Sequence, residues 1–282
     1  MDNWVILTIL YAIFTGFFQC SKKKAAEKNS IYEVLASFTL ISFLIVAFTS
    51  KDVFNVELQY IMIILAKSLV IVVAWLLSLY AMSNMSISLY GVINLSRIIF
   101  SVILSLIFLG EKLTITTFIG LVIVIIGLIL VDRISNKKDN KEASFKVIAI
   151  LLFACFLNSV SAIIDKKILS NITSSQLQFW FLLFLTIAYW WIILIRNKKI
   201  DFKNLNKNYW VLGAAVALAV GDKFLFMANA IPESSVIVMT LLKKISTIEL
   251  IILGKIIFKE KNIIKKLLCS LLIIFGITLT LI

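Results

Sequence analysis

Residues 108–131 read FLGEKLTITTFIGLVIVIIGLILV, in which the charged pair Glu111 and Lys112 precedes 19 residues without any charge. An apolar segment of about 20 residues crosses a membrane as a helix. Comparable segments recur along the chain and predict spans at 4–20, 31–49, 58–82, 86–109, 114–131, 147–164, 175–195, 209–230, 233–258 and 263–281. We therefore predict an all-α integral membrane protein with ten transmembrane helices.

The composition of the 282-residue chain agrees with this prediction, since 61% of its residues are hydrophobic and 15% are charged. A soluble globular protein is about 45–50% apolar and about 25% charged. Histidine, the commonest metal ligand and general base, is absent. Cys20, Cys155 and Cys269 lie far apart in apolar runs, a pattern typical of neither a zinc site nor a disulfide framework. We expect no enzyme activity, no cofactor and no metal.

The connections between the spans carry Lys and Arg unequally, with 18 in one alternate set and 4 in the other. The positive-inside rule places the rich set in the cytoplasm, which predicts that both termini face outward. The net charge of +13 lies mostly in these connections, so it indicates orientation and not nucleic-acid binding. We expect a multi-pass protein of the cell membrane, the inner or plasma membrane of a bacterium, with the lipid bilayer and a small-molecule substrate as partners and no nucleic acid.

The two halves of the chain match when one is shifted by 149 residues. This shift pairs Ala81 with Ala230, Ser86 with Ser235, Glu111 with Glu260, Lys112 with Lys261, and Gly127 with Gly276. Because each half holds five predicted spans, an odd number, the second half enters the membrane inverted. We predict a first five-helix repeat over 1–131, a connecting loop over 132–146, and a second five-helix repeat over 147–282. Inverted repeats are typical of secondary transporters, whose substrates bind near the middle of the membrane.

The segment Phe108–Thr114, followed by Gly120 and Gly127, resembles the signature of EamA-type transporters of the drug/metabolite transporter (DMT) superfamily. Phe258–Asn262 with Gly276 resembles its second copy. The resemblance covers the whole chain and implies ten helices in two repeats, secondary transport of small metabolites, and a cavity lined by helices 1, 3, 4, 6, 8 and 9. It also implies cytoplasmic termini, opposite to the prediction from charge, so both orientations stay open. The proline usual in helices 4 and 9 is replaced by Ile98 and Thr247.

Seven charged residues lie deep in the predicted spans: Lys67, Arg97, Asp222, Lys223, Lys243, Lys244 and Glu249. Each costs roughly 2.5–3.5 kcal/mol at the bilayer centre, so seven facing lipid would cost on the order of 20 kcal/mol. That exceeds the whole stability of a typical protein, about 5–15 kcal/mol. They are therefore expected to face the protein interior, where five bases and two acids leave a surplus of positive charge suited to an anion. Glu33, Asp165 and Lys255, near span ends, are expected to extend toward the membrane surface.

These residues define the predicted site. We assign substrate binding to Lys67, Arg97, Lys243, Lys244, Trp75 and Tyr90, and charge coupling to Asp222, Glu249 and Lys223. A buried ion-pair network, with Trp75 and Tyr90 as core packing, is the structural alternative. The adjacent bases Lys243 and Lys244, with Arg97 in helix 4, resemble the phosphate-binding residues of plastid sugar-phosphate translocators. The position that corresponds best to the translocators' helix 4 lysine is Asn94, almost one turn from Arg97.

The leading prediction is a secondary transporter that moves a small metabolite, anionic or zwitterionic, by alternating access. One alternative is an exporter of amino acids or cationic compounds, and another is a membrane subunit with a structural or regulatory role. Small multidrug exporters use a buried glutamate in their first helix, and neither 4–20 nor 147–164 contains an acid. A cation exporter is therefore disfavoured. Proton coupling or exchange, and a monomer or a homodimer, are all left open.

Overall fold

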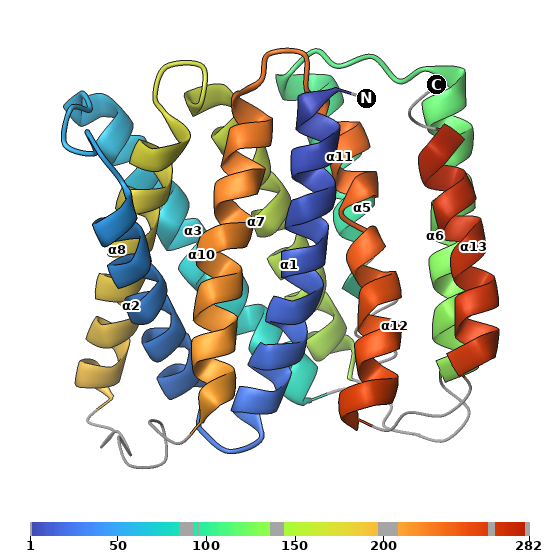
Figure 1. Ribbon diagram of the computed structural model, residues 1–282, viewed down its shortest axis with the longest axis horizontal. Coiled ribbons are helices and arrows are strands. Elements are labelled where there is room, and N and C mark those ends of the chain that lie inside the picture. Colours follow the sequence, from blue (N-terminus) through green and yellow to red (C-terminus); the bar gives the residue numbers. More distant parts are fainter. Residues whose placement is uncertain are drawn as a thin grey trace. The chain divides into compact units, whose positions relative to one another are not determined.

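The computed structural model describes residues 2–84, 93–94, 96–135, 144–196, 208–258 and 263–279. Helices account for every regular element in these ranges (Figure 1). They are α1 (Asn3–Ala26), α2 (Ile31–Thr49), α3 (Leu58–Ser83), α5 (Ser96–Phe108), α6 (Ile115–Ser135), α7 (Phe145–Ile168), α8 (Ser174–Ile195), α10 (Tyr209–Ala230), α11 (Val236–Leu242), α12 (Ile245–Phe258) and α13 (Ile263–Leu279). Among the described residues, six helices are long and apolar enough to cross a membrane, namely α1, α2, α3, α7, α8 and α10. The chain is therefore an all-helical, multi-pass membrane protein.

Two helices begin with a capping box, in which an N-cap hydroxyl and the side chain three residues later satisfy backbone amides of the first turn. Ser30 and Glu33 form the box of α2, with the Glu33 carboxylate accepting from the Ser30 amide at 2.9 Å. Thr173 and Gln176 do the same for α8. Glu33, expected only to extend toward the membrane surface, thus has a defined structural role.

The predicted span 233–258 is not one continuous helix, because Lys243 and Lys244 lie in a turn between α11 and α12. The hydrogen-bond pattern tightens there. The Lys243 amide donates to the Met239 carbonyl four residues back, and the Lys244 amide donates to the Leu241 carbonyl three residues back, at 2.9 Å. A stretch of such tight bonds inside a longer helix often marks a hinge.

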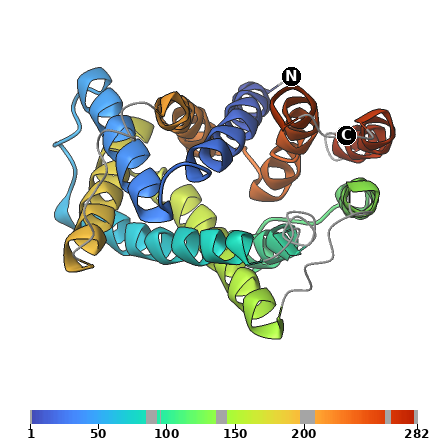
Figure 2. The same ribbon diagram turned by 90° about the horizontal axis from the view of Figure 1, so that it is seen from below.

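The described chain divides into two compact units, and the first consists of residues 1–72 and 168–232. Within it α1 packs along α10, and α2 packs against both α8 and α10 (Figures 1 and 2). Buried side chains reach carbonyls of neighbouring helices: Ser42 donates to Ala215 at 2.9 Å, and Gln178 donates to Ala219 at 2.5 Å. Interhelical bonds of this kind join helices in lipid, where apolar burial gives little driving force.

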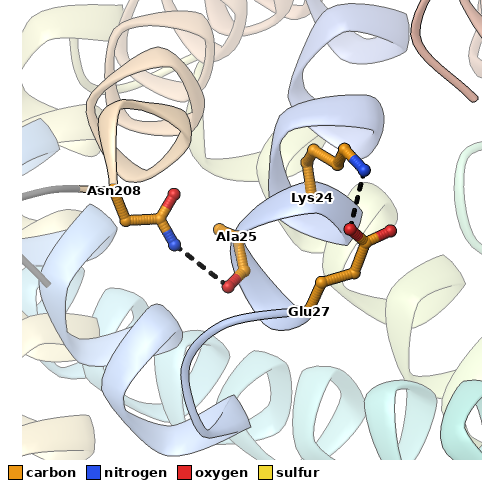
Figure 3. A network of polar contacts seen from close by, with 4 residues as sticks. All are labelled: Lys24, Ala25, Glu27 and Asn208. Carbon is orange, nitrogen blue, oxygen red and sulfur yellow. Dashed lines mark hydrogen bonds and ion pairs between the residues drawn. The ribbon is translucent and has the colours of Figure 1, made fainter. Parts of the chain in front are cut away.

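Asn208, just before α10, joins the start of that helix to the end of α1. Its amide nitrogen donates to the Ala25 carbonyl at 3.2 Å, drawn in Figure 3, and to the Asn29 side chain at 2.8 Å. Beside it, Lys24 and Glu27 form an ion pair of 2.7 Å within the α1 end (Figure 3). The buried Asn208 side chain thus adds an interhelical donor to a helix-end carbonyl that also accepts from the Lys28 and Asn29 amides.

The second unit consists of residues 73–167 and 233–282, and in it α6 and α13 lie side by side in both views (Figures 1 and 2). Two glycines permit their close approach. A Cβ on Gly276 would lie 2.8 Å from the Gly120 carbonyl oxygen, and a Cβ on Gly127 would lie 2.8 Å from the Ile273 side chain. Small residues at helix contacts are the usual device for close packing in membranes.

Candidate substrate site

Polar side chains join α5 and α7 inside the second unit. The Ser101 hydroxyl donates to the Ser159 hydroxyl at 3.1 Å, and Ser159 in turn donates to the Arg97 carbonyl at 3.2 Å. Both serines are buried, with 2% and 0% of their surface exposed. Since hydroxyls inside a membrane protein need partners, this arrangement fixes Arg97 of α5 against α7.

Four charged or polar groups meet next to these serines. The Cys155 thiol of α7 donates to the Asn94 side chain at 3.4 Å. Arg97 and Lys244 lie within electrostatic reach of each other and of the Cys155 sulfur. The structure therefore brings Arg97 together with the α11–α12 turn, although the two positions lie far apart in the sequence.

The Cys155 thiol and the Asn94 amide are neutral groups beside these two positive charges. Within the described part of the second unit, no ion pair involves Arg97 or Lys244. Lys243 and Glu249 of the same unit are half-buried, and each makes further contacts. A guanidinium, an ammonium and neutral hydrogen-bonding groups such as Asn94 form a chemically suitable set for an anionic group. Within the described residues, no cluster of His, Cys, Asp or Glu has the make-up of a metal site.

Lys67 lies in the first unit and has different surroundings. Its ammonium is 3.9 Å from the centre of the Phe181 ring and 4.8 Å from that of Phe226, and the residue is 1% exposed. A cation over aromatic faces is stabilised electrostatically, by about 2 kcal/mol or more when desolvated. Asp222 is buried one turn before Phe226 on α10, and both Lys67 and Asp222 make further contacts. Lys223 donates to the Ser175 hydroxyl.

The remaining assigned residues are the aromatic ones. Trp75 is half-buried in α3 and makes further contacts, whereas Tyr90 lies outside the described residues. Asp165 differs from its expected position at a span end, because α7 continues to Ile168 and leaves this residue only 5% exposed. The Lys255 side chain also lies outside the described set.

Sequence reasoning missed four polar contributors to this site: Asn94 as a bonded partner, Ser101, Cys155 and Ser159. Each lies inside an apolar run, and isolated polar residues in predicted spans were a usable signal for three of them. Cys155 lies in an apolar run without a metal-site or disulfide pattern, and it is buried, with 2% of its surface exposed. Its proximity to Arg97 depends on the packing of α7 against α5, which local patterns do not contain.

Comparisons with known proteins agree with the helical architecture. Residues 2–132 match the EamA-like transporter family. An uncharacterized protein of Methanocaldococcus jannaschii is 33% identical over 138 residues, which is 48% of this chain and all of that protein. One protein crystal structure superposes with a TM-score of 0.76 at 10% sequence identity. The match covers 98% of this chain and 95% of the other chain, and it shows the fold alone.

The apolar helices and the family match together define a membrane protein of the transporter class. The chain belongs to the EamA-like transporter family of the DMT superfamily. The family predicted from residues 108–127 is thereby confirmed.

Proposed function

We propose that the protein is a secondary transporter that moves a small anionic or zwitterionic metabolite across the cell membrane by alternating access. The anionic group of the substrate binds to Arg97, Lys243 and Lys244. One observation carries this proposal: the adjacent lysines lie in the turn that breaks a helix, and Lys244 is within electrostatic reach of Arg97. Discontinuous helices commonly form the substrate sites of secondary transporters.

The electrostatics of this pair favour a bound anion. Arginine side chains are cations in proteins, so Arg97 brings a fixed positive charge to this pair. Repulsion between like charges is stronger in a protein interior than in water. An anionic substrate group reduces this repulsion and forms charge-assisted hydrogen bonds, each contributing about 1.5–3 kcal/mol. The repulsion between Arg97 and Lys244 therefore favours binding of an anionic group between them.

The inverted repeat is supported by the glycines of α6 and α13. Gly127 approaches Ile273, and Gly276 approaches Val124. The shift of 149 residues converts the first contact into the second, as expected when two equivalent helices meet around a two-fold axis. Because position 124 faces 276 while 127 faces 273, the two helices run antiparallel. This relation is what one expects of repeats over 1–131 and 147–282.

The comparisons add support for the same division. The family match ends at residue 132, beside the predicted boundary at 131. The archaeal relative is half as long as this chain and is matched over its whole length. We propose two five-helix repeats joined by the loop 132–146.

The remaining deep charges have other roles in this proposal. Lys67 stacks on two phenylalanine rings, which favours a packing role over substrate contact. Asp222 and Glu249 are the acids available for coupling transport to protons, and exchange of two substrates is the alternative. Lys223 donates a hydrogen bond to Ser175 and thereby places a positive charge where α8 and α10 meet.

The test is transport into proteoliposomes of a panel of phosphorylated metabolites, amino acids and quaternary amines. We expect uptake or exchange of an anionic or zwitterionic compound, lost in Lys244→Gln and kept in Lys112→Gln. Lys112 is the matched control because it is exposed and its charge lies outside this site. Selective transport of quaternary amines, or equal loss in both variants, would contradict the proposal.

The orientation of the chain is tested separately by cysteine labelling. If the charge count determines orientation, an impermeant reagent outside the cell labels sites engineered near residues 1 and 282 and leaves the loop 132–146 unlabelled. The reverse pattern gives the cytoplasmic termini that the resemblance implies.

A further inference from the structure

Glu111 follows α5 in a turn whose backbone conformation at Gly110 is one that glycine adopts easily. Gly110 has a φ of +65°, in the left-handed region that other residues rarely adopt. After this turn the Glu111 amide donates to the Ser105 carbonyl at 3.4 Å. The chain is thereby redirected, and the half-buried Glu111 side chain lies against the start of α11.

The Glu111 carboxylate accepts three hydrogen bonds from that helix start. The donors are the Ser235 hydroxyl at 2.8 Å, the Val236 amide at 2.5 Å and the Ile237 amide at 3.1 Å. The Ser235 hydroxyl then accepts from the Val238 amide at 3.3 Å. The first three amides of α11, which have no partner within the helix, are all satisfied.

A second contact fixes the same end. Lys166 of α7 donates to the Ser234 hydroxyl at 2.6 Å and lies within electrostatic reach of Glu111 and Glu233. The α5–α6 turn, the end of α7 and the start of α11 therefore meet in one polar junction of the second unit. A carboxylate bonded to amides and near an ammonium is among the stronger polar contacts in proteins.

The other end of α11 carries the proposed substrate residues. The helix has only 7 residues, about 10 Å at 1.5 Å per residue, and Lys243 follows it directly. Six of its residues are buried, so the helix is held along its length as well as at its start. A shift of the start of so short a helix is transmitted to Lys243 and Lys244.

We infer that Glu111 is a positioning residue: by holding the start of α11 it sets the place of Lys243 and Lys244 beside Arg97, and its release lets α11 and the two lysines move. The inference rests on the proposed function only for what those lysines bind. Its structural content, a latch between the α5–α6 turn and α11, is tested without any substrate.

Cys155 provides the readout. In a background carrying Cys20→Ala and Cys269→Ala it is the one remaining thiol, it is 2% exposed, and it lies within electrostatic reach of Lys244. The experiment measures the rate of its alkylation by N-ethylmaleimide in the full-length protein, reconstituted in nanodiscs. In Glu111→Gln we expect the rate to rise at least about tenfold, a population shift that corresponds to about 1.4 kcal/mol.

Glu33→Gln is the matched control. Glu33 also caps a helix with its carboxylate, but its partner Ser30 belongs to the start of the same helix. We expect Glu33→Gln to lower the melting temperature and leave the alkylation rate unchanged. Lys112→Gln, next to Glu111, should leave both unchanged. Equal rates in Glu111→Gln and Glu33→Gln would overturn the inference.

Ser235→Ala removes one of the three donors and also covers the case in which Glu111→Gln does not fold. We expect a smaller rise in the alkylation rate. In the double variant, the change in the logarithm of the alkylation rate should be smaller than the sum of the two single changes, because both substitutions break the same contact. Full additivity, or no change in Ser235→Ala, would speak against the latch.

The substrate assignment and the Glu111 latch can be disproved independently of each other. If the transport panel identifies no anion while Glu111→Gln still accelerates alkylation, the substrate assignment is wrong and the latch stands. If an anion is transported and bound through Lys244 but the alkylation rate does not respond to Glu111→Gln, the latch is wrong and the substrate assignment stands.

Discussion

Lys67 and Lys244 are both lysines within predicted spans, but their neighbours are of opposite kinds. Lys67 stacks on the rings of Phe181 and Phe226 and is 1% exposed. Lys244 lies in a helix break, near a second cation and a set of neutral polar groups. Aromatic faces stabilise a buried ammonium within the protein, whereas a cluster of like charges needs a counter-ion. The sequence makes these lysines look equivalent, and their surroundings give them different roles.

The largest effect on stability is expected for Lys67→Met. This change keeps a side chain of similar length and removes two cation–π contacts of about 2 kcal/mol each. The free energy of unfolding, measured by detergent titration, should therefore fall by up to about 4 kcal/mol. Transport should persist in the folded fraction. Phe181→Leu, which removes the nearer ring, should show a smaller loss. A Lys67→Met protein of normal stability with weakened substrate affinity would reverse the comparison.

Lys244→Gln should act on binding and not on stability. Loss of one charge-assisted hydrogen bond, about 1.5–3 kcal/mol, lowers affinity roughly 10- to 150-fold. Stability should stay the same or rise, because the repulsion from Arg97 is relieved. Substrate affinity and unfolding free energy are measured on the same purified variant. Unchanged affinity beside a large loss of stability would place Lys244 in the same structural role as Lys67.

Gly276→Ala tests how closely the helices of the second unit approach. The added methyl would lie 2.8 Å from the Gly120 carbonyl oxygen and 2.9 Å from the Val124 amide nitrogen, both backbone atoms. Overpacking of this kind costs typically 1–3 kcal/mol. The control is Gly213→Ala in the first unit, where the nearest atom, a serine hydroxyl, is 3.3 Å away. We expect the melting temperature to fall for Gly276→Ala and to change little for Gly213→Ala.

The smallest effect should follow Ser159→Ala, which removes the hydroxyl between Ser101 and the Arg97 carbonyl. A net loss of about 1 kcal/mol in unfolding free energy is expected for such a hydrogen bond. The control is Thr186→Val, because among the described residues the Thr186 hydroxyl has no hydrogen-bond partner. If both variants unfold alike, the serine contacts do not hold Arg97 in place.

Apolar runs predicted most helices because membrane crossing imposes length and composition on a sequence. The break at Lys243 was not predictable in this way, since neither proline nor glycine marks it. The phenylalanines over Lys67 belong to α8 and α10, more than 100 positions away, and only packing brings them there. The shift of 149 residues singled out both Glu111 and Ser235, yet it matched each with its repeat partner and gave no sign that they bind one another.

The bond between Asn208 and the Ala25 carbonyl has a consequence for biosynthesis. The two residues are 183 positions apart, and a ribosome adding about 5–20 residues per second needs roughly 10–40 s to reach the second after the first. During that interval the nascent α1 is already made while its main neighbour, α10, does not yet exist. Helix α1 therefore completes its packing only after α10 has been made, and the insertion machinery has to tolerate a partly packed membrane protein during that interval.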